Sequence, residues 1–126
     1  MNKAQELPIY RNSYCLTQEV MTYTAKFPKD YKFTLGNRLN EDCVNLTALL
    51  LEVTYTDNIE ELLKIYIKLL NRIRLQLRLC SDFKLLSHGQ QSSLICRLEC
   101  LISQSMAWYR KERRKNRNTL SSNCQS

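Results

Sequence analysis

The chain has 126 residues, of which 44% are hydrophobic and 25% are charged, and it contains only two glycines and two prolines. This length suits one compact domain, and the hydrophobic content excludes a wholly disordered chain. Sheet proteins need turn residues every ten residues or so, so the scarcity of glycine and proline predicts long helices. No stretch approaches the roughly 18 uncharged apolar residues of a membrane span, and residues 1–10 lack a secretory signal pattern. We therefore expect a soluble, cytoplasmic protein.

The charge is divided unevenly along the chain. The net charge is +7, yet residues 1–61 hold six Lys/Arg and nine Asp/Glu, which gives −3. Residues 62–126 hold thirteen Lys/Arg and three Asp/Glu, which gives +10. Basic regions attract polyanions by releasing counterions, so nucleic acid is the leading class of partner and an anionic membrane surface the weaker one.

Two helices are predicted in the first half. Pro8 suits the first turn of a helix that runs to about Lys26, and Phe27-Pro28 interrupts it because proline disfavours helix in the preceding residue. A second helix then starts at Pro28, and Gly36 near its start allows close backbone packing. The apolar positions with helical spacing are Ile9, Leu16, Val20, Tyr23 and Phe27 in the first helix, and Leu35, Leu39, Leu46, Leu50 and Val53 in the second.

Two further helices are predicted in the second half. Asp57 and Glu60 have capping-box spacing ahead of a third helix from Ile59 to about Cys80, and Ser87 and Gln90 repeat that spacing ahead of a fourth. Their apolar positions are Ile59, Leu62, Tyr66, Leu69, Ile73, Leu77 and Cys80, then Leu94, Leu98, Leu101, Ser105 and Trp108. We predict an all-α domain, an antiparallel up-down-up-down four-helix bundle over residues 1–115, followed by a disordered polar tail over residues 116–126.

The first candidate binding surface lies on the third helix. Its basic residues lie opposite the apolar positions, and no acidic residue occurs between Glu61 and Asp82 to pair with them along the helix. We expect Lys68, Arg72 and Arg78 to point away from the core and to tolerate charge reversal. A merely solvated helix face is the alternative. These basic residues are Lys64, Lys68, Arg72, Arg74 and Arg78.

The second candidate surface lies at the end of the fourth helix, where only Glu112 offsets six basic residues. One or two cations there would suffice to complement the helix dipole, so the surplus favours polyanion binding. Such side chains contact phosphates, and no motif that reads bases accompanies them. These basic residues are Arg110, Lys111, Arg113, Arg114, Lys115 and Arg117.

Some apolar residues lie outside the predicted core positions. They are either buried deeper within one bundle or are available for self-association, because a helix that is apolar on more than one side needs a second partner surface. The sequence leaves both readings open. These residues are Ile67, Leu75 and Leu79 on the third helix and Ile95, Cys96 and Cys100 on the fourth.

No enzyme class is favoured. The six cysteines have irregular spacing and no CxxC pair, so we expect free thiols, no metal and no cofactor. The single histidine, His88, has no acid or nucleophile at a recognised spacing. Glu41 and Asp42 are adjacent and point about 100° apart on a helix, which does not make an acid pair. We therefore expect no catalytic residues.

Two groups of segments resemble a known family. Phe27-Pro28-Lys29-Asp30-Tyr31 followed by Leu35-Gly36-Asn37-Arg38-Leu39 resembles the four-helix-bundle family that includes proteins encoded in intervening sequences of bacterial 23S ribosomal RNA genes. The segment from Leu77 to Ser87, with Trp108 and the basic run after it, is similar to the accessory variability determinant (Avd) branch of that family. Residues 45–52 lack the Asn-Ile-Ala-Glu-Gly type signature of the ribosomal branch, which favours the Avd branch.

This resemblance, which covers residues 7–115, implies a basic bundle that assembles into a ring-like homopentamer. It also implies association with the reverse transcriptase of a diversity-generating retroelement and with its template RNA or cDNA, in support of mutagenic cDNA synthesis. Binding would fall on the basic positions, especially Arg72, Arg74, Arg78, Arg110 and Arg113. The alternatives are a ribosomal-intervening-type bundle without a polymerase partner and a purely structural oligomeric adaptor.

Overall fold

The structure is a computed structural model that describes residues 2–125, with side chains for residues 2–120. Within that range the chain is all-helical and contains no strand. The elements are η1 (Lys3–Glu6), α1 (Pro8–Thr24), α2 (Lys29–Tyr31), η2 (Lys32–Gly36), α3 (Asn37–Leu50), η3 (Leu51–Thr54), α4 (Ile59–Asp82) and α5 (His88–Gln125). Four helices are long, and none of those described is both long and apolar enough to cross a membrane.

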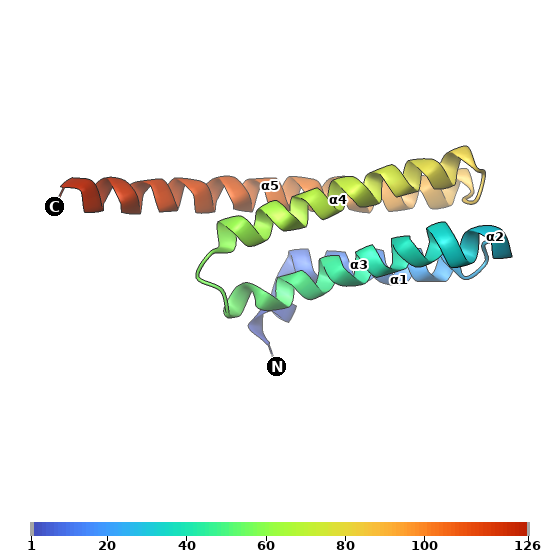
Figure 1. The fold of residues 1–126 in the computed structure, drawn as a ribbon, viewed down its shortest axis with the longest axis horizontal. Coiled ribbons are helices and arrows are strands. Elements are labelled where there is room, and N and C mark those ends of the chain that lie inside the picture. Colours follow the sequence, from blue (N-terminus) through green and yellow to red (C-terminus); the bar gives the residue numbers. More distant parts are fainter. Residues whose placement is uncertain (1, 126) are drawn as a thin grey trace.

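The four long helices lie side by side around one core. Helix α1 packs against α3 and α5, and α4 packs against α3 and α5, so each long helix has two neighbours (Figure 1). The core consists mainly of leucines contributed by all four helices, among them Leu16, Leu46, Leu70 and Leu98, which are fully buried. The sequence-predicted core positions are buried or partly buried in every helix.

The second helix differs from the continuous helix predicted from Pro28. It is divided into the short α2, a π-helical turn over Lys32–Gly36, and α3. A β-carbon at Gly36 would lie 3.3 Å from the Tyr31 carbonyl oxygen and 3.5 Å from Phe27 Cδ2. The expected close packing at Gly36 is therefore confirmed, and it occurs where the backbone widens into the π-helical turn.

The caps of the last two helices were predicted with mixed success. Helix α5 begins at the predicted capping box, in which Gln90 N–H donates to Ser87 Oγ (3.1 Å) and Ser87 N–H donates to Gln90 Oε1 (3.0 Å). The prediction for α4 was wrong by one residue, because Asn58 rather than Asp57 caps it by accepting from the Glu61 N–H (3.1 Å). Asp and Asn are equally good caps, so composition does not separate the two registers.

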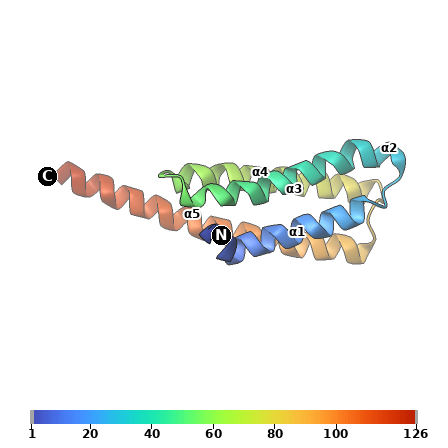
Figure 2. The same cartoon turned by 90° about the horizontal axis from the view of Figure 1, so that it is seen from below.

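Helix α5 is much longer than the sequence predicted. It continues to Gln125 instead of giving way to an irregular tail after residue 115. The physical reason is that neither glycine nor proline occurs after Gly89, so nothing in the chain stops the helix. At 1.5 Å per residue its 38 residues span about 57 Å, and its C-terminal end projects beyond the other helices (Figure 2).

A hydrogen-bonded carboxylate joins α1 to α5. Glu19 accepts hydrogen bonds from Ser93 Oγ, from Arg97 Nε at 2.7 Å and from Tyr23 Oη at 2.9 Å. Burial opposes ionisation of Glu19, but these donors together outweigh it and lower the pKa of the carboxyl group below 4.5. A lowered pKa in the folded state means that ionised Glu19 stabilises the fold at neutral pH.

We predict that Glu19→Gln lowers the free energy of unfolding at pH 7 by about 1–2 kcal/mol, because it removes charge-assisted hydrogen bonds. The contribution of Glu19 is fully present above its unfolded pKa and is lost as pH falls through the lower, folded pKa. The difference between wild type and variant should therefore shrink below about pH 4.5. Urea denaturation across this pH range measures it, and a pH-independent difference would contradict the role of the ionised carboxylate.

Candidate nucleic-acid interface

The basic residues of α4 are largely compensated by acidic residues of other segments. We call this set the α4 basic face: Lys64, Lys68, Arg72, Arg74 and Arg78. Arg72 donates from Nε to Asp42 Oδ2 (3.0 Å) and from Nη2 to Asp42 Oδ1 (2.8 Å). Arg74 pairs with Glu99 on α5, and Lys64 Nζ lies 3.8 Å from Glu61. The expectation of an unpaired basic row was wrong for these three residues, because the partners of Arg72 and Arg74 come from helices distant in sequence.

Asp42 is the most buried member of this network. Its side chain is only 11% exposed, whereas that of Arg72 is 59% exposed. The buried side chain of Gln76 donates from Nε2 to Asp42 Oδ2 (2.9 Å), so α4 supplies three donors to one carboxylate on α3. The hydrogen bonds that Arg72 donates to Asp42 raise the pKa of its guanidinium above the usual value. Arg72 is therefore a structural residue, and the expected tolerance to its reversal does not follow.

A sequence signal for this network exists. Asp42 lies three residues after Leu39 and four before Leu46, and Gln76 lies three after Ile73 and four before Cys80. Both polar residues thus occupy core positions of their helices. A carboxylate at a core position needs a partner, and an amide at a core position of the neighbouring helix supplies one.

Lys68 and Arg78 are the members of the α4 basic face that make no ion pair among the described side chains. Arg78 lines a hollow of about 460 Å³ between α4 and α5, but this hollow also contains Asp82 and Glu99. Lys68 lines another beside Ile65 and Leu49. The α4 basic face therefore mixes free cations with acidic and apolar neighbours.

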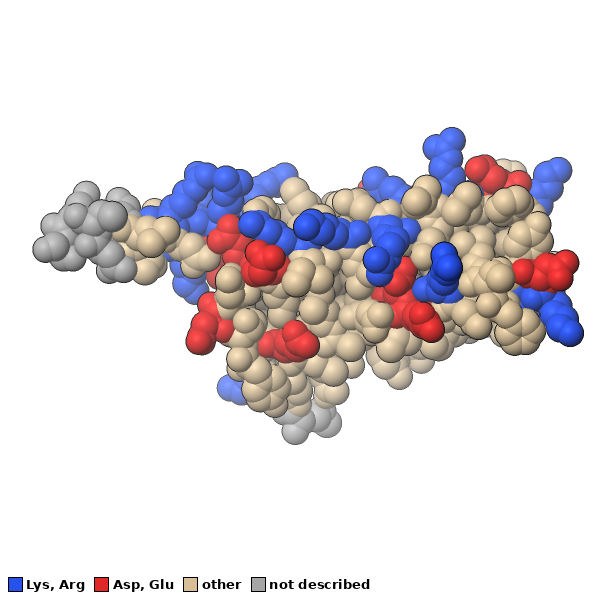
Figure 3. Space-filling model, viewed as in Figure 1, with Lys and Arg blue, Asp and Glu red and all other residues tan. Residues whose placement is uncertain are grey.

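The basic run of α5 has a different environment. We call this set the α5 cationic face: Arg110, Lys111, Arg113, Arg114, Lys115 and Arg117. All six of its residues are exposed, and none makes an ion pair among the side chains described up to residue 120. Nearby acidic residues are engaged by neutral donors instead: Asn116 Nδ2 donates to Glu60 Oε2 (2.9 Å), and Trp108 Nε1 donates to Glu112 Oε1 (3.3 Å). Blue side chains accordingly gather where α5 passes the start of α4, and a row of them continues along α4 (Figure 3).

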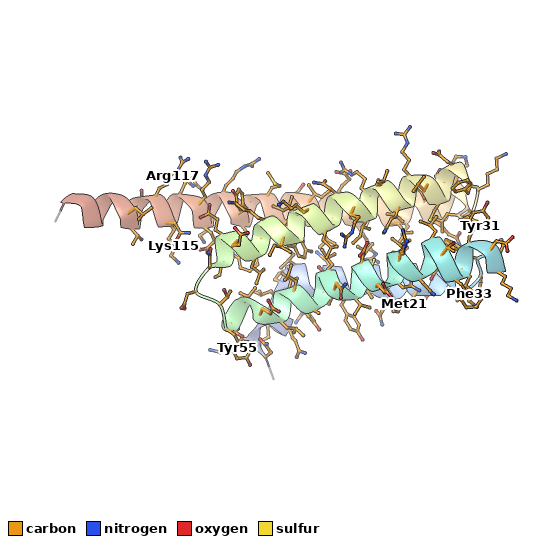
Figure 4. The ribbon with its side chains drawn as sticks, in the orientation of Figure 1. Met21, Tyr31, Phe33, Tyr55, Lys115 and Arg117 are labelled. Atoms are coloured by element: carbon orange, nitrogen blue, oxygen red, sulfur yellow. The ribbon has the colours of Figure 1, made fainter. Side chains whose placement is uncertain are left out.

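The two candidate surfaces differ in whether their cations are paired with carboxylates of the same chain. The hydrogen bond from Asn116 to Glu60 places this part of α5 beside the first turn of α4. Lys115 and Arg117 point to opposite sides of α5 (Figure 4). A polyanion contacting the α5 cationic face need not displace an internal carboxylate, whereas one contacting Arg72 or Arg74 competes with Asp42 or Glu99.

Five of the six cysteines have side chains in the described part of the chain. Cys15, Cys43, Cys80, Cys96 and Cys100 are free thiols, while the side chain of Cys124 lies outside the described part. Burial raises the pKa of Cys43 to about 12 and that of Cys80 to about 11, so both remain protonated at neutral pH. No group of three or more His, Cys, Asp or Glu residues is placed to hold a metal ion within the described chain.

Comparison of the chain with protein-family models and with curated proteins gave no match.

We predict that Arg72→Glu lowers the free energy of unfolding by about 2 kcal/mol, because it removes charge-assisted hydrogen bonds and places a second carboxylate beside Asp42. Arg78→Glu, on the same helix, should change it by no more than about 0.5 kcal/mol. Urea denaturation of both variants measures the difference. Equal effects of the two substitutions would contradict the structural role of Arg72.

Proposed function

We propose that this chain is a non-enzymatic nucleic-acid-binding protein whose main contact surface is the α5 cationic face. The observation that carries the proposal is that six exposed cations within eight residues have no ionic partner among the described side chains. Like charges this close repel one another, and a bound row of phosphates relieves the repulsion. Binding would release counterions and would be largely independent of sequence.

The α4 basic face contributes less in this proposal. Lys68 and Arg78 extend the positive surface along the molecule, while Arg72 and Arg74 serve mainly to join α4 to its neighbours. Lys64 lies closest to the α5 cationic face but shares its charge with Glu61. We therefore assign nucleic-acid contact first to the six residues of the α5 cationic face and second to Lys64, Lys68 and Arg78.

We further propose that the long helices form an antiparallel up-down-up-down four-helix bundle. Successive long helices contact one another, and the connections between them are short. Only three residues of irregular chain, Tyr55–Asp57, precede the Asn58 cap of α4. The connection from α4 to α5 spans residues 83–87.

The biological setting that we propose rests on the resemblance to the Avd branch. In that setting the protein, located in the cytoplasm, associates with the reverse transcriptase of a diversity-generating retroelement and with its template RNA or cDNA. The rival settings are a ribosomal-intervening-type bundle without a polymerase and a structural adaptor. A reverse transcriptase gene and an imperfect repeat pair beside the gene for this chain would separate the first setting from the others.

We also propose a homo-oligomer, most simply the homopentamer that the resemblance implies. Helix α4 exposes large apolar side chains that no neighbouring helix covers, including Ile65, Leu75 and Leu79, at 48%, 58% and 37% exposure. A surface of this kind on a single chain favours self-association.

The contribution of the α5 cationic face to binding is tested by removing three of its cations. Changing Arg110, Arg113 and Arg117 to Gln should weaken binding to nucleic acid and flatten the plot of log affinity against log salt by about 2–3, since each lost phosphate contact removes about 0.7–0.9 from the slope. Salt titrations by fluorescence anisotropy, against a structured RNA and a DNA duplex, measure this. Circular dichroism checks helicity.

The control is the double change Lys26→Ala and Lys29→Ala, which removes exposed cations from the turn after α1 and from the start of α2 and should leave the slope unchanged. If the triple variant is folded and binds both nucleic acids with the wild-type affinity and slope, the α5 cationic face is not the binding surface. In that case a parallel variant, Lys68→Gln with Arg78→Gln, tests the α4 basic face.

The predicted assembly is measured by analytical ultracentrifugation of the purified chain at micromolar concentration. A homopentamer of the 14.9 kDa chain sediments with a mass of about 75 kDa, which is five times the single-chain mass. High salt removes bound nucleic acid, and reductant prevents disulfides through the exposed Cys96 and Cys100. A single 14.9 kDa species under these conditions would rule out the oligomer.

A further inference from the structure

We propose that the α5 cationic face selects B-form duplex DNA, with α5 lying in the major groove, over single strands and over duplex RNA. This inference rests on the proposed nucleic-acid binding and adds the class of nucleic acid that fits. It follows from the positions of the basic side chains around α5, from the side of α5 that the bundle occupies, and from the types of residue that are absent.

The basic side chains divide into a centre and two flanks. With Arg110 set at zero and about 100° per residue, Arg114 lies at about 40° and Asn118 at about 80°. Lys111 and Lys115 lie at about 100° and 140° on one flank, and Arg113 and Arg117 lie at about 300° and 340° on the other. The opposed directions of Lys115 and Arg117 in Figure 4 agree with this division.

The bundle occupies the remaining side of α5. Ser105, Trp108, Glu112 and Asn116 fall between about 160° and 240° on the same scale. Ser105 is fully buried, Trp108 packs against the core, and Asn116 donates to Glu60 of α4. The centre of the cationic arc, near 40°, is therefore diametrically opposite the bundle, so the bundle does not obstruct an approaching duplex.

The dimensions match a B-form major groove. An α-helix with side chains is about 10–12 Å across, and that groove is about 12 Å wide. Cations on both flanks then face the two phosphate backbones, while Arg110, Arg114 and Asn118 face the groove floor. The major groove of A-form RNA is deep and too narrow for this arrangement.

The residue types disfavour single strands. Proteins that bind single strands combine a basic groove with aromatic side chains on which bases stack. No aromatic residue occurs in positions 110–126. The nearest aromatic side chains, Trp108 and Tyr109, are both partly buried, and Trp108 donates to Glu112.

The experiment compares binding of the full chain to three fluorescent probes with equal numbers of phosphates: a DNA duplex of about two helical turns, an RNA duplex of the same sequence, and an unstructured single-stranded DNA. We expect the DNA duplex to bind about tenfold more tightly than either of the others. The variant Lys111→Ala with Lys115→Ala removes one flank, so it should flatten the salt slope for duplex DNA by about 1.8 and reduce the preference. The variant Lys26→Ala with Lys29→Ala is the control of equal charge and should match wild type in both respects.

The possible outcomes separate this inference from the proposed function. Equal binding of all three probes, with equal losses in the flank variant, would overturn the groove assignment while leaving nucleic-acid binding intact. Tighter binding of duplex RNA or of the single strand would also overturn it. Binding of duplex DNA that the flank variant leaves unchanged would overturn the groove assignment alone, whereas the absence of binding to every probe would overturn both proposals. Circular dichroism of each variant ensures that a loss of binding is not a loss of helix.

Discussion

The pairing of the Asp42 carboxylate determines how α4 lies against α3 and which cations of α4 remain free on the surface. It lies at a core position of α3, almost completely buried, and its two oxygens accept from Arg72 and Gln76 of α4. A charge taken out of water in this way is tolerated only where donors are supplied with good geometry. The network therefore restricts how far α4 can slide along α3. Because Arg72 is paired with Asp42, it is a structural residue and is not one of the free cations on α4.

A similar arrangement holds the other side of the molecule together. Glu19 on α1 accepts from Ser93 and Arg97 on α5, and Arg74 on α4 pairs with Glu99 on α5. Leucine side chains determine that the helices pack, but they are similar in size along each helix and tolerate alternative registers. Polar contacts between particular positions tolerate a shift in helix register less well. Three of the four helix pairs in contact are thus joined by a charged group.

The sequence predicted the helical class, the core positions and the fourth-helix cap because these depend on local spacing. Leu94, Leu98 and Leu101 repeat at helical intervals, and Ser87 with Gln90 satisfies the first turn from within. The division of α4 cations into paired and free residues could not be predicted in the same way. It depends on Asp42 and Glu99, which lie 30 and 25 positions from their partners. A charge pattern read along one helix does not contain that information.

The length of α5 was missed for a related reason. A polar composition after Arg114 indicated a tail, because such residues cannot bury a hydrophobic face. Helical structure requires no hydrophobic face when the chain continues from a packed helix, since propagation adds one hydrogen bond per residue without a new nucleus. Asn116 adds a contact to Glu60 at the point where α5 passes the start of α4. Residues 116–119, which are among the polar residues that suggested a tail, are thus exposed side chains of a helix.

This continuation adds Arg117 to a helix that was already expected to carry the other five cations of the α5 cationic face. In a flexible chain, six such cations would adapt to any polyanion at the cost of ordering the backbone during binding. On a helix held by the bundle their relative directions are already fixed, so the backbone is ordered before binding. The spacing of the charges then favours some polyanions over others. A fixed arc of cations discriminates between polyanions by shape, since phosphates must lie where the side chains point. The same rigidity that supports α5 against α4 therefore converts a general attraction for phosphate into a geometric requirement on the partner.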